Sequence, residues 1–288
     1  VMRTAISLSQ IVPQSAGHSL ARLAAGLVAR LKPAVYDVVQ ANIKQVLGPG
    51  AERRTIDETV RKVFDTSLRG YFDLFRAIRL PREELASMVD ISDESREVAR
   101  SLWNRKGGAV LVFPHLGSFD LVGHAAVDLL PEMQLFTLPN PPPGFQIANE
   151  IRRRTGVHVT PLSSTALRDA IKLLRRGGIV SVAGDRPVSD LDEPVSFFGR
   201  PARVPSGHIR LALQTGAVIS VVYSVFSSET NRHTMIFEPP MELIRTGDRK
   251  VDSAANLRRV LDELERIIAA WLEQWQMFVP VWPELTGI

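Results

Sequence analysis

The chain has 288 residues, of which 45% are hydrophobic and 23% are charged. These values suit a folded protein with a substantial core and exclude a disordered or low-complexity chain. Cysteine is absent, which excludes disulfides, thiolate nucleophiles and cysteine-ligated metals. The net charge is +4, and residues 1–54 carry seven basic and two acidic residues. This asymmetry indicates an anionic partner, either lipid headgroups, an acidic carrier protein or nucleic acid, or simply a solvated helix face.

The first hundred residues are predicted to be helical. Within 15–47, four leucines recur at helical spacing with basic residues between them, and Pro33 interrupts the pattern: Leu20, Leu23, Leu27 and Leu31. Such a helix can lie on a membrane surface, or it can pack its leucines into the core, which is the commoner arrangement. Two further helices are expected at 55–79 and 93–105.

Strands alternate with helices from residue 106 onward. The sequence predicts strands at 109–113, 133–138, 157–161, 179–184, 218–226 and 233–238. It predicts helices at 118–130, around 152–154, and at 164–176, 207–215 and 253–275. This alternation predicts an α/β fold with a mainly parallel central sheet flanked by helices. We expect an N-terminal helical layer over 1–105 and an α/β region over 106–288, within one integrated domain.

The carboxyl ends of parallel strands are where α/β proteins place their chemistry. That rule indicates that the loops 114–118 and 184–205 contain the functional site. His115 follows the first strong strand directly, and Asp120 lies in the first turn of the next helix. A carboxylate that accepts the Nδ1–H of an imidazole leaves Nε2 free to take a proton. Although a histidine in such a turn is more often structural, the flanking strand and helix favour a general base.

Other functions remain open at this point. His115, Asp120 and His124 offer three potential metal ligands, so a metal-dependent hydrolase is one alternative. A non-catalytic lipid-binding protein also fits the basic, leucine-rich segment. Nucleic-acid binding is disfavoured, because the basic residues are not interleaved with an aromatic platform.

The segment Pro114–Asp120 resembles the His-x4-Asp/Glu motif of the glycerolipid and lysophospholipid acyltransferase superfamily. The resemblance is strongest to the branch of the lipid A biosynthesis (lauroyl/myristoyl) acyltransferases and the phosphatidylinositol mannoside acyltransferases. Further elements match this branch in order: Asn42-Ile43, Arg152–Gly156, Gly177-Gly178, Gly184-Asp185-Arg186, Phe197–Gly199, Pro205–Gly207, and Glu273–Trp275 with Trp282. The resemblance covers nearly the whole chain. Residues 217–222 depart from it by lacking a proline that the family often has there.

This resemblance implies transfer of a fatty acyl group from acyl-CoA or acyl-carrier protein to a lipid hydroxyl, with no cofactor and no metal. The acceptor is a lipid A precursor, a phosphatidylinositol mannoside or a lysophospholipid. The resemblance implies that His115 is the base and that Asp120 orients it. The family has a further catalytic acid shortly before Phe-Phe-Gly. Glu193, with Asp192 beside it, is the nearest match here, with a spacing one residue longer. Residues 1–105 would then face the membrane, and 106–288 would hold the catalytic site.

Substrate binding is assigned to a second set of residues: Arg152, Arg154, Asp185, Arg186, Ser206 and Gly207. The arginines would bind phosphate groups, with an ion pair from Arg186 to Asp185 or Asp190 as the structural alternative. Backbone N–H groups at Ser206-Gly207, or in the Gly117-Ser118 turn, would stabilise an oxyanion. Phe197 and Phe198 would line an acyl channel or pack in the core, and Trp271, Trp275 and Trp282 would lie at the membrane interface or in the core.

The sequence has no run of 18 apolar residues, so no membrane-spanning helix is expected. We expect attachment to the cytoplasmic face of the membrane, either peripheral or through a segment missing from this chain. Because the imidazole must be neutral to accept a proton, we also expect activity to fall below about pH 6–6.5.

Overall fold

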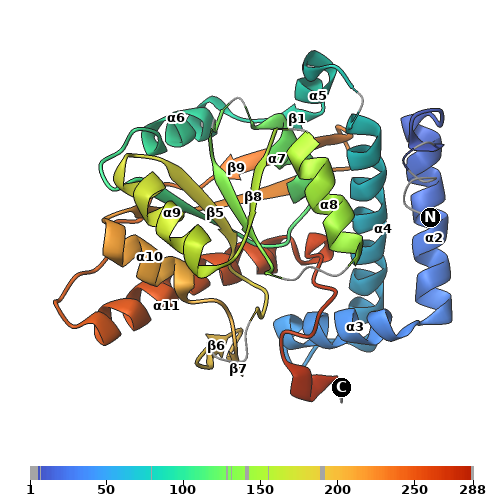
Figure 1. Cartoon of the computed structure of the whole chain (residues 1–288). Coiled ribbons are helices and arrows are strands. Elements are labelled where there is room, and N and C mark those ends of the chain that lie inside the picture. The colour runs from blue at the N-terminus through green and yellow to red at the C-terminus, as the bar shows by residue number, and fades with distance from the viewer. Residues whose placement is uncertain are drawn as a thin grey trace.

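The computed structural model describes residues 6, 8–78, 80–127, 129–130, 132–139, 143–154, 156–188 and 192–286. Seven strands form one sheet in the order β1-β9-β8-β2-β5-β3-β4 (Figure 1). Their bounds are β1 (Val89–Asp90), β2 (Ala109–Phe113), β3 (Gln134–Thr137), β4 (His158–Pro161), β5 (Ile179–Ala183), β8 (Val218–Ser227) and β9 (Arg232–Phe237). The sheet is parallel except for the antiparallel pair β8–β9. The predicted α/β fold is therefore confirmed.

Strand β2 lies at the centre of the sheet and buries both of its faces. Val110 and Val112 belong to a core that includes residues of three helices, α9 (Ser164–Arg175), α10 (Gly207–Thr215) and α11 (Arg249–Ala270). Ala109 and Leu111 point to the other face, where α6 (Asp93–Leu102) and α7 (Phe119–Ala125) contribute to a second core. The two-residue period of a strand explains this division.

The N-terminal helices form a layer at one side of the sheet. They are α2 (Gln14–Leu31), α3 (Ala34–Leu47) and α4 (Arg53–Ala77), with the break at Pro33 as expected. Figure 1 shows α4 between α2 and the sheet. α2 packs on α4 through small residues and one histidine: Gly17, His18, Ala21 and Ala25.

The leucine row of α2 does not enter the core. Leu20, Leu23, Leu27 and Leu31 are 59%, 72%, 55% and 69% exposed. The commoner interpretation, in which these leucines pack inward, is therefore wrong. The helix buries a narrower face instead, because Gly17 and the two alanines allow close contact with α4; a Cβ at Gly17 would overlap the Phe72 ring at 2.1 Å. Across the described residues, no helix has both the length and the hydropathy needed to cross a bilayer.

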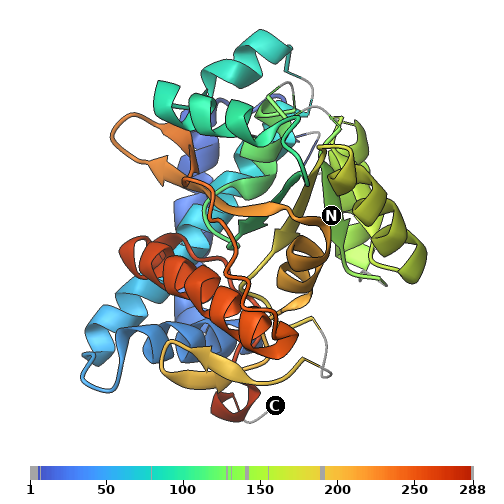
Figure 2. The same cartoon turned by 90° about the vertical axis from the view of Figure 1, so that its left-hand side faces the viewer.

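Several elements differ from the sequence predictions. The expected loop at 185–205 contains a hairpin, β6 (Val195–Phe197) and β7 (Arg200–Ala202), and two short elements were not predicted, α5 (Arg82–Ser87) and β1. Figure 2 shows this hairpin beneath α11. Two bonds connect them: the backbone N–H of Phe198 donates to Glu265 and the Arg258 guanidinium donates to the Ser196 carbonyl. Helix α7 ends at Ala125, earlier than the predicted 130. Helix α8 (Pro143–Arg154) carries Arg152, Arg153 and Arg154, as expected.

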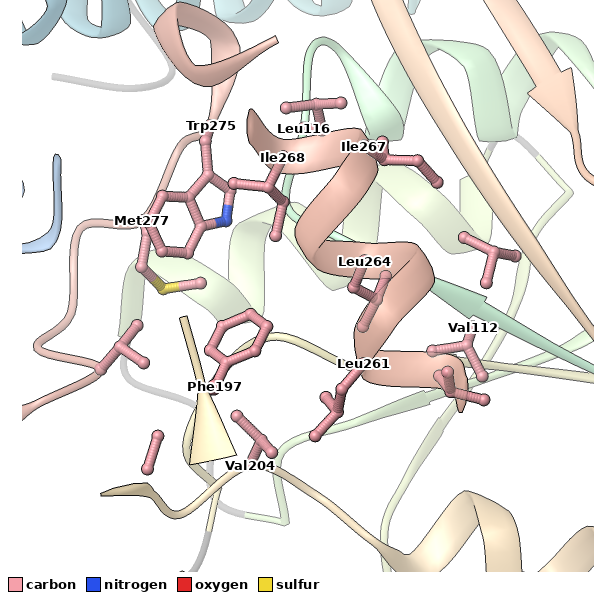
Figure 3. Packing of buried hydrophobic residues seen from close by; sticks show 14 of the residues in the cluster. Val112, Leu116, Phe197, Val204, Leu261, Leu264, Ile267, Ile268, Trp275 and Met277 are labelled. Atoms are coloured by element: carbon pink, nitrogen blue, oxygen red, sulfur yellow. The ribbon is translucent and has the colours of Figure 1, made fainter. Parts of the chain in front are cut away.

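The final helix ends at Ala270, not at 275, and the chain turns through a short 3-10 helix, η1 (Leu272–Gln274), into an extended segment. Figure 3 shows why: Trp275 enters the core beside Ile268, with Met277 and Phe197 nearby. Trp275 and Trp282 are completely buried. The membrane-interface alternative for these two tryptophans is wrong, and Phe197, stacked on Trp282 at 5.9 Å, is a core residue.

Candidate active site

His115 lies at the carboxyl end of β2, two residues beyond the last strand residue. Strand β5 is the parallel neighbour of β2, and Phe113 pairs with Ala183 in register. The bond from the Gly184 N–H to the Phe113 carbonyl continues this pairing past the strands. His115 and Asp185 therefore lie side by side at the same edge of the sheet, just beyond two adjacent strands. Nδ1 of His115 is 2.8 Å from Oδ1 of Asp185.

Asp185 is completely buried and accepts several hydrogen bonds. The backbone N–H of His115 donates to Oδ2 at 2.7 Å, and the indole N–H of Trp275 donates to the same oxygen at 2.8 Å. Burial opposes ionisation of this carboxyl group. The charge of His115 and the hydrogen bonds from His115 and Trp275 outweigh burial, so the pKa of Asp185 lies below its ordinary value. The carboxylate is thus held ionised against the imidazole.

The carboxylate at Nδ1 is not the one that the sequence predicted. Asp120 lies on α7, and its Oδ1 accepts a 2.7 Å hydrogen bond from Nε of Arg152. Arg152 also donates to the side chain of Asn149 at 2.7 Å. The prediction that Asp120 orients His115 is wrong, because strand register brings Asp185 to the imidazole while α8 brings a guanidinium to Asp120. The substrate-binding role expected for Asp185 does not fit its complete burial either.

The C-terminal segment holds the histidine loop on its other side. The N–H of Gln276 donates to the His115 carbonyl at 2.7 Å, and the N–H of Gly117 donates to the Gln274 carbonyl at 3.0 Å. The Gln276 side chain donates to the Gly117 carbonyl at 2.6 Å. Because the Gly117 N–H already donates to the Gln274 carbonyl, it does not fit the expected role of stabilising an oxyanion. The loop is fixed by residues about 160 positions away in the sequence.

Gly117 is required by this packing. Its φ is +58°, and a Cβ would lie 2.4 Å from the Ser224 carbonyl oxygen. Any side chain at this position would strain the backbone and push the loop off β8. The Ser224 hydroxyl, in turn, donates to the Leu116 carbonyl at 2.9 Å. The loop that carries His115 is therefore pinned between β8 and the C-terminal segment.

An apolar cavity of about 70 Å³ lies between the sheet and α7, and two aromatic rings next to His115 belong to its wall. The His115 ring contacts Phe119 edge-on, with ring centroids 5.3 Å apart, and its centroid is 6.1 Å from that of Phe113. Both phenylalanines line the cavity, and the Asp120–Arg152 ion pair is also part of its wall. The imidazole, with an exposed side-chain fraction of 15%, thus reaches the wall of the cavity through these two rings and does not line the cavity itself.

The remaining predicted site residues are Arg186, Ser206, Gly207, Glu193 and Arg154. Arg186 follows Asp185 directly, and burial lowers the pKa of its guanidinium. Ser206 donates to Asp192 at 3.3 Å, and Gly207 begins α10. Glu193 is exposed before the β6–β7 hairpin, and no contact joins it to His115 among the described interactions. The side chain of Arg154 lies outside the described residues. These binding and catalytic roles therefore stay predictions.

A second histidine–aspartate cluster lies deep in the protein. Asp73 of α4 is completely buried, with His18 Nε2 at 2.8 Å from one carboxylate oxygen and His233 Nε2 at 3.1 Å from the other. Burial opposes its ionisation, but hydrogen bonds and charges from both histidines outweigh burial and lower the pKa of Asp73. The cluster joins α2, α4 and β9. Within the part of the chain that the structure describes, no group of three or more acidic or histidine side chains is arranged to hold a metal ion.

The chain is similar to known proteins over nearly its whole length. Residues 4–284 match the model of the bacterial lipid A biosynthesis acyltransferase family. The chain belongs to this family. A phosphatidylinositol mannoside acyltransferase of Mycobacterium tuberculosis (strain CDC 1551 / Oshkosh) is 29% identical over 182 residues, covering 61% of this chain and 54% of that protein. The enzyme of the same name from Mycolicibacterium smegmatis is 26% identical over 255 residues, covering 85% of this chain and 78% of that protein.

The match to the M. tuberculosis relatives thus spans only about half of their length. Sequence reasoning found His115 but missed the roles of Asp185, Trp275 and Gln276 in holding it. The signals were present, since Asp185 follows a predicted strand and Trp275 belongs to the family-like C-terminal ending. What was missing was the order of strands in the sheet, which makes β2 and β5 neighbours.

Proposed function

We propose that this chain is an O-acyltransferase that transfers a fatty acyl group from a thioester to a lipid hydroxyl. The observation that carries the proposal is His115, held at Nδ1 by the ionised Asp185, with its ring next to two phenylalanines that line an apolar cavity. Membership of an acyltransferase family supports it independently. The donor is acyl-CoA or acyl-carrier protein, and the cavity takes its acyl chain.

The proposed reaction needs no covalent enzyme intermediate. Nε2 of His115 removes the proton of the acceptor hydroxyl as its oxygen attacks the thioester carbonyl. The C–O bond forms, the C–S bond breaks, and the proton passes from the imidazolium to the leaving thiolate. Asp185 keeps the imidazole in the tautomer with a proton on Nδ1 and stabilises the imidazolium between the two transfers. Trp275 holds Asp185 in this orientation.

For the acceptor, we propose a mannosylated inositol phospholipid, because the similar proteins of known name are phosphatidylinositol mannoside acyltransferases. The Asp120–Arg152 pair at the cavity wall supplies a positioned guanidinium for an anionic group of the donor or acceptor. A lipid A precursor and a lysophospholipid are the alternatives to be measured against it.

We further propose that α2 docks on the cytoplasmic face of a membrane. Its exposed leucine row is flanked by exposed Arg22, Arg30 and Lys32, the composition of a helix that binds anionic lipid surfaces. Sedimentation with phosphatidylglycerol vesicles should carry the wild type down. Replacing Leu23 and Leu27 by glutamine should weaken this binding, whereas Leu167→Gln, at a 41% exposed leucine of α9, should not. Equal binding by all three proteins would refute docking through α2.

The catalytic proposal is tested by mass spectrometry of products from a panel of the three acceptor classes, each with acyl-CoA and with acyl-carrier protein. His115→Gln should lower the rate by about 100- to 10,000-fold, the usual contribution of a general base. His158→Gln, at an exposed histidine beginning β4, is the matched control and should leave the rate unchanged. Full activity in His115→Gln would overturn the mechanism, and absence of acyl transfer to every acceptor would overturn the function.

A further inference from the structure

The apolar cavity is lined along one side by α7 and the turn that follows it. Phe119, Val122, Gly123, Ala126 and Leu130 all contribute to this wall. Within α7, the spacing of Phe119, Val122 and Gly123 places them on one face of the helix. Phe119 contacts the His115 ring, so it marks the end of the cavity nearest the proposed chemistry. Gly123 lies one turn further on, about 6 Å along the helix axis.

Gly123 is unusual because nothing in the backbone requires a glycine there. It sits inside α7, and it is not among the residues with positive φ. A Cβ built at this position meets no atom within 4 Å. A glycine inside a helix is unfavourable relative to alanine. Neither backbone conformation nor close packing therefore accounts for the missing side chain.

The open space around Gly123 adjoins the cavity, which is small. Its volume of about 70 Å³ is well below the roughly 150 Å³ of an apolar cavity that binds benzene. Met133 and Met235 also line it, and methionine side chains adapt readily to a bound group. An entering acyl chain would extend past Phe119 and displace such flexible side chains. A rigid group projecting from position 123 would obstruct it one helical turn beyond Phe119.

We infer that Gly123 is a specificity-determining residue: its missing side chain keeps the cavity open so that long acyl chains can pass α7. This inference rests on the proposed function, since it identifies the cavity as the acyl site of the donor. The occupant is the hydrocarbon chain of the donor, because the wall is apolar beyond the Asp120–Arg152 pair, apart from the hydroxyls of Ser181, Tyr223 and Ser224. The size of the side chain at position 123 then limits the length of the acyl chain that the cavity accepts.

The test compares the full-length wild type with Gly123→Ala and Gly123→Leu, using octanoyl-, lauroyl- and palmitoyl-CoA as donors. Gly123→Leu should lower kcat/KM for palmitoyl relative to octanoyl transfer by about tenfold or more, as expected for a blocked apolar pocket. Gly123→Ala should shift the preference in the same direction by less. Gly26→Ala, at another helical glycine with no atom within 4 Å of its Cβ, is the matched control for helix propensity and should keep the wild-type preference.

A second measurement separates this inference from the proposed function. Titration calorimetry with non-transferable S-alkyl-CoA analogues of the same chain lengths reports binding without turnover, and melting temperatures verify folding. If Gly123→Leu selectively loses the long-chain analogue while the wild type transfers nothing, the cavity is an acyl site and the proposed function alone fails. If folded Gly123→Leu and Gly123→Ala show the wild-type chain-length preference, in transfer or in binding, the inference is overturned. Failure of the wild type to bind any analogue overturns it too.

Discussion

The protein contains two histidine–aspartate clusters of similar chemistry in different surroundings. Asp185 and Asp73 are both completely buried, both have a lowered pKa, and both lie within 2.8 Å of a histidine nitrogen. Asp73, however, is enclosed by His18 and His233, whose side chains are only 7% and 1% exposed. His115 lies at a strand end, is partly exposed, and has its ring next to two phenylalanines that line a cavity. The difference teaches that access to substrate, rather than the pairing itself, makes one cluster a candidate for catalysis.

Neutralising each aspartate in turn is the strongest test of whether only the His115–Asp185 cluster supports catalysis. Asp185→Asn should reduce kcat/KM by about 100-fold or more, because the imidazole loses its orientation and the charge that stabilises the imidazolium. Steady-state rates of both variants test this effect. Asp73→Asn should leave kcat/KM near the wild-type value and lower thermal stability instead, and a matching loss of activity in both variants would contradict the distinction.

A second variant separates the two carboxylates near the cavity. Asp120→Asn should lower kcat/KM by about tenfold through loss of the charge-assisted bond to Arg152, and mainly by raising KM. Its kcat should stay close to that of the wild type, because the Asp120 carboxylate bonds to Arg152 and His115 pairs with Asp185. A larger loss of kcat in Asp120→Asn than in Asp185→Asn would restore the pairing that the His-x4-Asp spacing first indicated.

A smaller effect is expected at the tryptophan that positions Asp185. Trp275→Phe removes the indole N–H that donates to Asp185 while keeping an aromatic ring in the core. We expect kcat to fall by about three- to tenfold, with KM little changed, because the aspartate gains freedom to rotate.

The matched control is Trp282→Phe. The Trp282 indole N–H is equally buried but has no hydrogen-bond partner within the described structure. This variant should cost stability through lost packing and leave kcat near that of the wild type. Equal loss of kcat in the two variants, at equal melting temperatures, would show that Trp275 acts through packing alone.

The smallest effect concerns stability in acid, where the two clusters should behave alike. Because folding lowers the pKa of Asp73 and of Asp185, each stabilises the fold fully above its unfolded pKa of about 3.9 and loses that contribution as pH falls toward its lower folded value. The melting temperature should therefore drop below about pH 4. Asp73→Asn and Asp185→Asn should each flatten this drop, and an unchanged slope in both would contradict the linkage.

The sequence determined the local elements because their signals are local. Apolar runs between glycines predict β2 and β5, and helical periodicity interrupted by Pro33 predicts the break between α2 and α3. His115 was found because it follows a strand directly, which is a property of neighbouring residues. The hairpin within 185–205 was missed because its strands are three residues each and are held by α3 and α11 rather than by their own propensity.

Only the tertiary structure decided which carboxylate serves His115 and which leucines meet solvent. The pairing of His115 with Asp185 depends on β2 and β5 being neighbours in register, a choice made by packing across 70 residues of chain. The exposure of the α2 leucine row depends on the small residues that let the other face of the helix sit against α4. Periodicity fixes that a helix has two faces, but the shape and the partners of the surrounding elements decide which face is buried.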